Sequence, residues 1–336
     1  MVIYNMKRIA INGFGRIGRA AFKIALEHKN ELDVVAINDL FDTKILAYLL
    51  RYDSVYGKYE KEVNFEEKHL IVEGKSYPVY AEKEPQKLPW GTLEVDTVIE
   101  STGIFTSEEK MRLHLEAGAK KVLLSAPPKG AGISTHILGV SDIARDSNPL
   151  KSNASCTTNS ITAPVYLMHQ RFGVKKALLT TVHGYTADQN LVDGPHRDLR
   201  RARAAAINIV PTTTGAAIST TEVITDLKGK FDGIALRVPV PAGSVSDITM
   251  VLAKSVTVEE VNNTFKEAAN SPRYKGIIGV SEDPIVSSDI LKTSYSGIID
   301  LPFTKVVDGD LVKILSWYDN EWGYACRLIE SVIQGS

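Results

Sequence analysis

The sequence has few cysteines, no long apolar run and almost no net charge. Its only two cysteines, Cys156 and Cys326, are too few for a disulfide framework and wrongly spaced for a zinc site, so we expect no metal centre and a reducing, cytoplasmic setting. No apolar run approaches the roughly 18 residues that span a bilayer, and the opening MVIYNMKRIAING lacks a secretory-signal layout. The formal net charge of −1 provides no general attraction for nucleic acid or an anionic membrane. A globular protein of about two domains is expected.

The first part of the chain alternates strand-like and helix-like segments. Two β-rich runs flanking Glu73-Gly74 also predict an inserted hairpin. Such alternation is typical of parallel strands joined by right-handed crossovers, and it predicts an α/β fold with a Rossmann-type, doubly wound parallel sheet. The predicted strands are 7–12, 33–38, 96–100 and 120–125, and the predicted helices are 16–28, 45–52 and 107–118.

The pattern changes after about residue 155, where long β-rich segments follow one another with few helices between them. They predict a second, α+β domain built on a largely antiparallel sheet. The last helical pattern, 321–334, predicts a helix that packs on the first domain. We therefore expect one domain at 1–155, joined by 321–336, and a second at 156–320. The predicted strands here are 175–185, 233–240, 245–255 and 311–319, with a helix at 257–270.

A glycine-rich turn, GFGRIG, joins the first predicted strand to the first predicted helix. Gly13, Gly15 and Gly18 fit the pattern G-x-G-x-x-G. In that pattern the first glycine makes the tight turn, the second lets the backbone approach a pyrophosphate, and the third lets the helix pack closely on the strand. The pyrophosphate then lies on the N–H groups near Arg16 and Ile17. The alternative is a turn with a purely structural role.

Asp39 indicates which dinucleotide is bound. It follows the second strand, roughly 20 residues beyond the third glycine, where a carboxylate suits the ribose hydroxyls of NAD and repels the 2′-phosphate of NADP. Thr102 and Ser125 follow two later strands and are further candidates, because ligands of open α/β sheets bind beyond the carboxyl ends of the strands. The sequence therefore predicts an NAD site. If the glycine turn instead has a purely structural role, Asp39 is an exposed carboxylate that binds no ligand.

Cys156 has polar neighbours in SNASCTTNS (152–160), whereas a structural cysteine usually lies among apolar residues. The helical pattern from 161 to 172 places it at or just before a helix N-terminus, where a thiolate is stabilised. A thiolate beside NAD points to aldehyde oxidation through a hemithioacetal and a thioester, which requires a base. His183, between a strand and a polar loop, is the best candidate, although a histidine at a strand end is often structural.

Several blocks, in order along the chain, resemble the phosphorylating glyceraldehyde-3-phosphate dehydrogenase family. The resemblance implies a reaction that converts glyceraldehyde 3-phosphate, NAD and inorganic phosphate into 1,3-bisphosphoglycerate. It also implies a homotetramer in which a loop around 185–208 reaches toward a neighbour's cofactor. The blocks are INGFGRIGR (11–19), AINDL (36–40), SNASCTTN (152–159), TTVHGYTADQ (180–189), RRARAAA (200–206), PTTTGAA (211–217), RVPVP (237–241) and SWYDNEWGY (316–324).

The resemblance assigns roles to particular residues. Cys156 corresponds to the nucleophile and His183 to its acid–base partner. The implied ligands of the attacking phosphate are Ser155, Thr157, Thr214 and Gly215, and those of the substrate's own phosphate are Thr186 and Arg237, with Arg201 in the same region. The implied NAD contacts are Arg16, Ile17, Asp39, Lys83, Ser125 and Asn320.

Three positions depart from the family pattern. Lys83 replaces a common arginine, Ser160 replaces the second cysteine of CTTNC, and the segment 241–247 reads PAGSVSD. The missing thiol at Ser160 leaves an oxidised Cys156 without a local resolving partner, and we expect catalysis to survive it.

Two other functions compete with this interpretation. Erythrose-4-phosphate dehydrogenase would share the thiol and the histidine, but Thr186 and the intact TTTG at 212–215 favour the glyceraldehyde enzyme. A non-catalytic NAD- or RNA-binding protein is the other alternative, and the presence of both Cys156 and His183 argues against it. In the basic run RDLRRAR (197–203), Arg197, Arg200 and Arg203 are better explained as a solvated face or an intersubunit salt-bridge loop. A nucleic-acid patch is poorly supported, because the run lacks interleaved aromatic residues.

Overall fold

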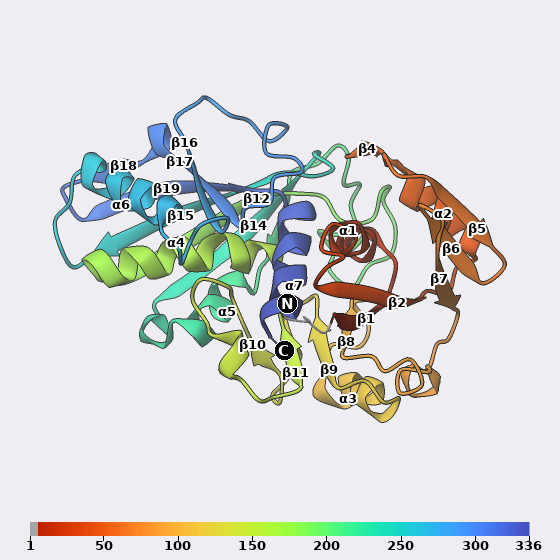
Figure 1. Cartoon of the computed structure of the whole chain (residues 1–336). Coiled ribbons are helices and arrows are strands. Elements are labelled where there is room, and N and C mark those ends of the chain that lie inside the picture. The colour runs from red at the N-terminus through yellow and green to blue at the C-terminus, as the bar shows by residue number, and fades with distance from the viewer. Residues whose placement is uncertain (1–5, 336) are drawn as a thin grey trace. The chain divides into compact units, whose positions relative to one another are not determined.

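The computed structural model describes residues 6–335 and divides into two compact units (Figure 1). One unit consists of Met1–His136, Asp142–Ala154 and Ala325–Ser336, and the other of Ile137–Ser141 and Ser155–Tyr324. Among residues 6–335, no helix has the length and apolar character needed to cross a membrane. Within the same range, no cluster of three or more His, Cys, Asp or Glu side chains is arranged to hold a metal ion.

The first unit is built on the predicted parallel sheet. Its nine strands lie in the order β10-β11-β9-β8-β1-β2-β7-β6-β5, parallel throughout except at the β5-β6-β7 edge. That edge contains the predicted hairpin, β6-β7, together with one further strand. The strands are β1 (Lys7–Asn12), β2 (Leu32–Asn38), β5 (Val63–Glu66), β6 (His69–Val72), β7 (Lys75–Tyr80), β8 (Thr97–Glu100), β9 (Lys121–Leu124), β10 (Ser134–Thr135) and β11 (Leu150–Ser152), and the helices are α1 (Arg16–Ala25), α2 (Thr43–Arg51) and α3 (Glu108–Glu116).

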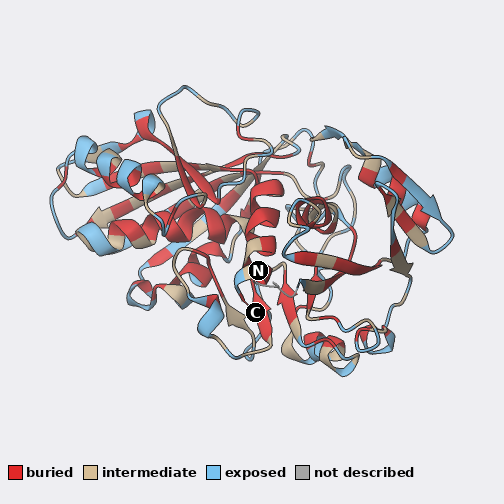
Figure 2. Ribbon diagram, in the orientation of Figure 1, coloured by how far each residue is buried: buried red, intermediate tan, exposed pale blue. Residues whose placement is uncertain are grey.

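The central strands of this sheet are apolar on both faces, as expected of parallel strands covered by helices. Ile9, Ala10 and Ile11 of β1 are fully buried, and all four residues of β8 are buried (Figure 2). Small two-residue strands and 3-10 turns complete the unit: β3 (Tyr52–Asp53), β4 (Gly57–Lys58), η1 (Pro85–Lys87) and η2 (Ile143–Arg145).

The end of the chain is bound to the first unit by hydrogen bonds. Helix α7 (Trp322–Gln334) leads into it, and the Nζ of Lys7 donates to the carbonyls of Val332 and Ile333. The Nζ of Lys121 donates to the carbonyl of Gly335 over 2.8 Å. These lysines satisfy carbonyl groups at the helix C-terminus, where positive charge is favoured.

The second unit is built on the predicted, largely antiparallel sheet. Its order is β13-β14-β12-β15-β19-β17-β16, with β18 beside β19 and with parallel pairing only at β12-β14 and β16-β17. Its strands are β12 (Val174–Gly184), β13 (Val210–Thr213), β14 (Phe231–Val238), β15 (Ser244–Leu252), β16 (Ile278–Ser281), β17 (Gly297–Asp300), β18 (Lys305–Val307) and β19 (Leu311–Tyr318), with α4 (Cys156–Phe172), α5 (Ala216–Val223), α6 (Val258–Asn270), η3 (Thr225–Leu227) and η4 (Leu301–Phe303).

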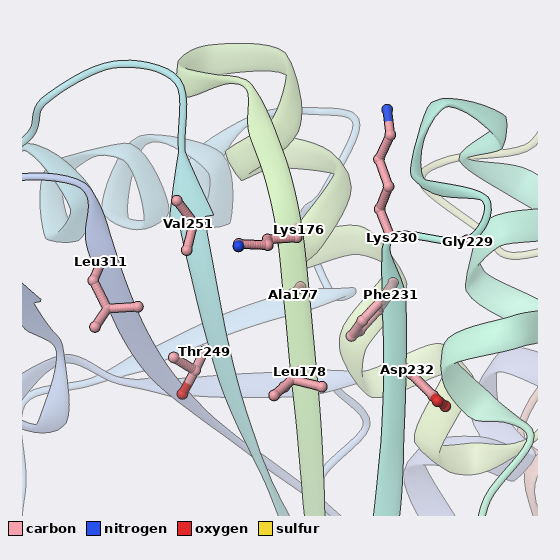
Figure 3. A pocket seen from close by; sticks show the side chains of 10 residues that line it. All are labelled: Lys176, Ala177, Leu178, Gly229, Lys230, Phe231, Asp232, Thr249, Val251 and Leu311. Atoms are coloured by element: carbon pink, nitrogen blue, oxygen red, sulfur yellow. The ribbon is translucent and has the colours of Figure 1, made fainter.

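The two faces of this second sheet differ. One face packs against α4, and the alternate residues of β12, β15 and β19 on that side are buried. The opposite face carries Leu178, which is 67% exposed, and Ile234, which is 50% exposed. Figure 3 shows side chains such as Leu178, Thr249 and Leu311 lining a pocket of about 430 Å³ on this sheet. An open apolar sheet face of this kind is typical of an interaction surface.

Candidate active site

Cys156 is the first residue of α4, as its polar setting predicts. Ser155 caps the helix, because its Oγ accepts a hydrogen bond from the N–H of Thr158 over 3.0 Å. The amide of Asn159 donates to the carbonyl of Ser155 over 3.0 Å and holds the same turn. The unpaired N–H groups of a helix start favour negative charge, so this position supports a thiolate.

His183 lies beside the thiol. It is the penultimate residue of β12, it is buried, and its Nε2 lies 3.4 Å from the Sγ of Cys156. Its Nδ1 is 2.6 Å from the carbonyl oxygen of Gly184 and 2.7 Å from Nη1 of Arg237. The two contacts favour opposite tautomers: the carbonyl requires a proton on Nδ1, whereas the guanidinium of Arg237 is a donor only and favours an unprotonated Nδ1. The role of general base requires the first tautomer, in which Nε2 is free to accept the thiol proton.

Arg237 comes to this place through strand register. β12 and β14 run parallel with His183 opposite Arg237, which brings together two residues far apart in the sequence. Nη1 of Arg237 also donates to the carbonyl of Gly184 over 3.2 Å, whereas its Nε has no hydrogen-bond partner among the described residues. A half-buried guanidinium with an unused donor is well suited to an anion.

Burial and charge shift the pKa values of the pair. Burial raises the pKa of the Cys156 thiol, while the positive charge of Arg237 and hydrogen bonds from Thr157 lower it. Burial and the charge of Arg237 together lower the pKa of His183 to about 3. Both directions favour a neutral thiol beside a neutral imidazole in the resting site. The neutral imidazole has the lone pair that a base needs, while its lowered pKa opposes a lasting charge on the ring.

Tyr318 is a site residue that the sequence interpretation missed. Its hydroxyl lies 2.9 Å from Oγ1 of Thr157 and 2.8 Å from Oγ1 of Thr181, and its ring packs edge-on against His183. It thereby links α4, β12 and β19 around the thiol and the imidazole. The block SWYDNEWGY contained Tyr318, but nothing in the residue types indicated that its hydroxyl bridges two threonines.

We expect Tyr318→Phe to destabilise the fold by about 1–3 kcal/mol, because two buried threonine hydroxyls lose a partner. It should lower kcat by less than about tenfold, since the thiol and the imidazole themselves remain. Urea unfolding and steady-state kinetics measure the two effects. Tyr295→Phe, at a more exposed tyrosine of the same unit, is the control, and equal stability of the two variants would contradict this account.

The residues predicted to bind phosphate all belong to the second unit and differ in the partners they already have. Arg201 is ion-paired with Asp188 at 2.6 Å, and Thr214 and Gly215 immediately precede α5, with Gly215 as its N-cap. The hydroxyl of Thr157 faces Tyr318, and the side chain and backbone N–H of Thr157 both favour negative charge on the Cys156 sulfur. Thr186 follows β12 in the polar loop, where its carbonyl accepts from the N–H of Gln189.

Asn320 is held by the segment that departs from the family pattern. Its Oδ1 accepts from the N–H of Gly243 and from the hydroxyl of Ser244, each over 3.0 Å. Gly243 has a φ of +89°, and a Cβ there would lie 2.6 Å from the carbonyl oxygen of Ser287. The PAGSVSD segment therefore requires its glycine and fixes the orientation of the Asn320 amide.

Ser160 has a packing role. Its hydroxyl donates to the carbonyl of Thr157 over 2.8 Å and lies 3.2 Å from the hydroxyl of Ser246 on β15. It therefore joins the first turn of α4 to strand β15 of the sheet.

Neither Cys156 nor Cys326 is in a disulfide, and Cys326 is buried.

The basic run forms part of an exposed loop. Within it Arg203 pairs with Asp193 at 2.9 Å, and Arg197 and Arg200 lie at its surface. The solvated-face interpretation agrees with this arrangement. The same loop also exposes Leu191, Val192, Leu199 and Ile207.

The first unit contains a cavity of about 500 Å³ at the carboxyl ends of its parallel strands. This is the place where open α/β sheets bind ligands, and the volume is in the range of small-molecule sites. Five of the predicted cofactor residues line it: Gly13, Gly15, Asp39, Lys83 and Thr102. The other lining residues are Asn12, Asn38, Leu40, Phe41, Glu82, Ser101, Ile104 and Phe105.

The three glycines of the turn have different surroundings. Gly13 has a φ of +94°, and a Cβ on it would lie 2.7 Å from the backbone N of Thr102. A Cβ on Gly18 would lie 2.0 Å from the carbonyl oxygen of Gly13, whereas a Cβ on Gly15 would meet no atom within 4 Å. Gly15 thus leaves open space before the start of α1, where a pyrophosphate is expected.

Asp39 and Arg16 already have partners in this structure. The carboxylate of Asp39 accepts from the N–H of Phe14 over 2.7 Å, which ties it to the glycine turn, and Arg16 pairs with Asp53 at 2.8 Å. Arg16, Ile17, Gly18 and Ser125 do not line the cavity, while Asn320 belongs to the second unit.

The glycine geometry predicts two different mutant phenotypes. Gly18→Ala should destabilise the first unit by about 2 kcal/mol or more, because its Cβ overlaps backbone. Gly15→Ala should leave stability within about 1 kcal/mol of wild type and raise the Kd for NAD about tenfold or more, because the methyl group fills the space for pyrophosphate. Thermal unfolding and calorimetric NAD titration test the pair. Full NAD affinity in Gly15→Ala would contradict the predicted pyrophosphate position.

Comparison with known proteins gives matches along nearly the whole chain. Residues 7–108 match the model of the glyceraldehyde 3-phosphate dehydrogenase NAD binding domain, and residues 155–320 match that of the C-terminal domain of the same family. A glyceraldehyde-3-phosphate dehydrogenase of Thermotoga maritima is 55% identical over 328 residues, covering 97% of this chain and 98% of the relative. Proteins of that name from Streptomyces coelicolor and Geobacillus stearothermophilus are each 50% identical, covering 97% and 96% of both chains, respectively.

Proposed function

The chain belongs to the glyceraldehyde-3-phosphate dehydrogenase family, and from that premise we propose that it oxidises glyceraldehyde 3-phosphate to 1,3-bisphosphoglycerate with NAD and inorganic phosphate. The observation that carries this proposal is the 3.4 Å approach of Sγ of Cys156 to Nε2 of His183 at the start of α4. A thiol that transfers its proton to a neighbouring base becomes a strong nucleophile toward an aldehyde.

The first half of the reaction follows from these two side chains. The sulfur of Cys156 attacks the aldehyde carbon, the thiol proton passes to Nε2 of His183, and that proton then goes to the new oxyanion to complete the hemithioacetal. His183 next accepts the hydroxyl proton as the hemithioacetal carbon loses hydride and becomes a thioester. NAD supplies the acceptor for that hydride when it is bound. Backbone N–H groups at the start of α4 are available to stabilise the oxyanion.

The second half is phosphorolysis. An oxygen of inorganic phosphate attacks the thioester carbon, the carbon–sulfur bond breaks, and Cys156 leaves as a thiolate. The thiolate takes back the proton held on Nε2 of His183, which restores the starting thiol and imidazole, and the proton of the hydrogenphosphate is released to solvent. We assign the attacking phosphate to Ser155, Thr157, Thr214 and Gly215. We assign the substrate's own phosphate to Thr186, Arg201 and Arg237. The unused Nε donor of Arg237 and the N-terminus of α5 support these assignments.

The residues of the first unit fit NAD. We assign the cofactor to Gly13, Gly15, Asp39, Lys83 and Thr102, which line the cavity, and also to Arg16, Ile17, Gly18, Ser125 and Asn320, which do not line it. The corresponding functional division is a cofactor domain of 1–155 with 321–336, and a catalytic domain of 156–320. The carboxylate of Asp39 disfavours NADP, because it would face a 2′-phosphate.

We further propose a homotetramer in the cytoplasm. The second sheet exposes the apolar side chains of Leu178 (Figure 3) and Ile234, and the loop at 185–208 exposes others. They need a covering surface, and a second copy provides an apolar one. A reducing compartment protects the reactive thiol that the mechanism needs. Light scattering over a dilution series should give the mass of four chains, and a monomer at all concentrations would contradict the proposal.

The test of function is NADH formation from glyceraldehyde 3-phosphate with and without inorganic phosphate. We expect sustained turnover only with phosphate, because the thioester otherwise accumulates. Erythrose 4-phosphate should give a lower kcat/KM than glyceraldehyde 3-phosphate. A higher value would favour the sister activity, and no NADH at all from reduced protein would favour the non-catalytic alternative. Neither alternative is favoured by the names of the relatives.

A further inference from the structure

A buried chain of hydrogen bonds runs beneath the cofactor cavity of the first unit. Its centre is the pair His114, on α3, and Glu100, at the end of β8, and both side chains are 0% exposed. A fully buried carboxylate is costly unless several donors satisfy it, so its partners decide what it does.

Trp90 sets the tautomer of His114. The indole Nε1–H of Trp90 is only a donor, and it lies 3.0 Å from Nδ1 of His114. Nδ1 is therefore the acceptor, and the ring proton lies on Nε2, which donates to Oε2 of Glu100 over 3.0 Å. The ring of His114 also lies 6.0 Å, centroid to centroid, from that of Phe105, with the two planes near perpendicular.

Glu100 accepts two hydrogen bonds on each carboxylate oxygen. Oε2 accepts from His114 and from the amide of Asn12 over 2.6 Å, and Oε1 accepts from the backbone N–H of Thr102, over 2.8 Å, and from its hydroxyl. Removing one donor leaves part of a buried negative charge unsatisfied. The carboxylate then has to move or to take up water, and its remaining partners move with it.

These partners form much of the cavity wall. Asn12, Thr102 and Phe105 all line it. Oδ1 of Asn12 in turn accepts from the amide of Asn38 over 2.7 Å, and Asn38 bonds both to the N–H and to the carbonyl of Glu82, each over 2.9 Å. One buried carboxylate thus connects the ends of β1, β2 and β8 and the segment after β7.

We propose that His114 and Glu100 are positioning residues for the cofactor: they hold Asn12 and the Thr102 turn in the geometry that binds NAD, without contacting it. This inference rests on the proposed NAD-dependent function. His114 acts through Glu100, so its loss should weaken cofactor binding and leave the chemical step at saturating NAD nearly unchanged.

The test compares His114→Leu, which removes both ring nitrogens, with His114→Gln, whose amide is able to donate to Glu100. We expect His114→Leu to raise the calorimetric Kd for NAD about tenfold or more, with the KM for glyceraldehyde 3-phosphate and kcat at saturating NAD within about twofold of wild type. His114→Gln should recover most of the lost affinity. Folded His114→Leu that binds NAD as tightly as wild type would overturn the proposal.

A matched control separates positioning from simple loss of stability. His136 forms another largely buried pair with a carboxylate, 2.7 Å from Asp146, and neither residue lines the cavity. We expect His136→Leu to lower the Tm while leaving the Kd for NAD unchanged. If His136→Leu weakens NAD binding as much as His114→Leu does, the effect is one of general stability and the proposal fails.

A second variant covers the case in which His114→Leu does not fold. Trp90→Phe removes the indole N–H that donates to Nδ1 of His114, and Trp90 does not line the cavity. It should also raise the Kd for NAD, and an unchanged value would overturn the proposal. Wild-type protein that binds NAD but forms no NADH would instead refute the proposed function alone.

Discussion

We expect the replacement of Cys156 by serine to lower kcat for NADH formation by about 10³-fold or more. A serine hydroxyl beside His183 is a much weaker nucleophile than a thiolate at neutral pH, and an oxygen ester at that position is a poorer acyl donor to phosphate than a thioester. The fold should persist, because the substitution changes one atom at a partly exposed helix start. Stopped-flow and steady-state measurements of NADH absorbance give the size of the loss.

The control for this substitution is the other cysteine. Cys326→Ala removes the buried thiol of α7 and should retain nearly full kcat, with at most a loss of stability of about 1–2 kcal/mol. Calorimetric NAD titration of Cys156→Ser should give a Kd near that of wild type. Turnover by Cys156→Ser at more than about a tenth of the wild-type rate would rule out the thiol as the nucleophile.

We expect the replacement of His183 by asparagine to lower kcat by about 10²–10⁴-fold, the usual contribution of a positioned acid–base group. The asparagine amide is able to bond the carbonyl of Gly184 in place of Nδ1, but it has nothing at the position of Nε2, which faces the sulfur at 3.4 Å. The proton transfer to the oxyanion and the later removal of the hydroxyl proton then both lack the imidazole that carries the proton. The residual activity should come from the thiolate formed at high pH.

The same variant has a pH signature. Burial raises the pKa of the Cys156 thiol, so in wild type the thiolate forms at a higher pH than it would at an exposed cysteine. A neutral Nε2 accepts a hydrogen bond from the thiol S–H and so stabilises the thiol form. Without it the pKa of Cys156 should fall, and iodoacetamide alkylation of Cys156 should begin at a pH lower by about half a unit or more. Alkylation rates across pH measure the shift. His28→Asn, at an exposed histidine of the other unit, is the control, and an unchanged alkylation profile in His183→Asn would contradict the role given to Nε2.

The parts of this site that were predictable from sequence are local. The start of α4 at Cys156 was predicted because polar residues precede an apolar helical pattern, and the glycine turn was identified by the strand before it and the helix after it. Helix caps and glycine turns depend on neighbouring residues, so their sequence signal is complete within about ten positions. Resemblance to a family added role assignments that spacing alone did not provide.

The parts that were not predictable depend on contacts between distant positions. The hydroxyls of Thr157 and Tyr318 meet because β19 and α4 pack together, and Arg237 reaches His183 because β12 and β14 pair in one register. Trp90, Glu100 and His114 converge in a core from three separate segments. No residue pattern indicates such meetings, because strand register and helix packing are settled by the whole fold.

The central claim is that Cys156 carries the acyl group between oxidation and phosphorolysis. The most direct measurement is mass spectrometry of the protein quenched in acid after mixing with NAD and glyceraldehyde 3-phosphate in the absence of inorganic phosphate. We expect a phosphoglyceroyl adduct on the peptide that contains Cys156, formed with one NADH per site and lost when phosphate is added before the quench. NADH formation without any adduct on Cys156, or an adduct that phosphate does not remove, would contradict the account.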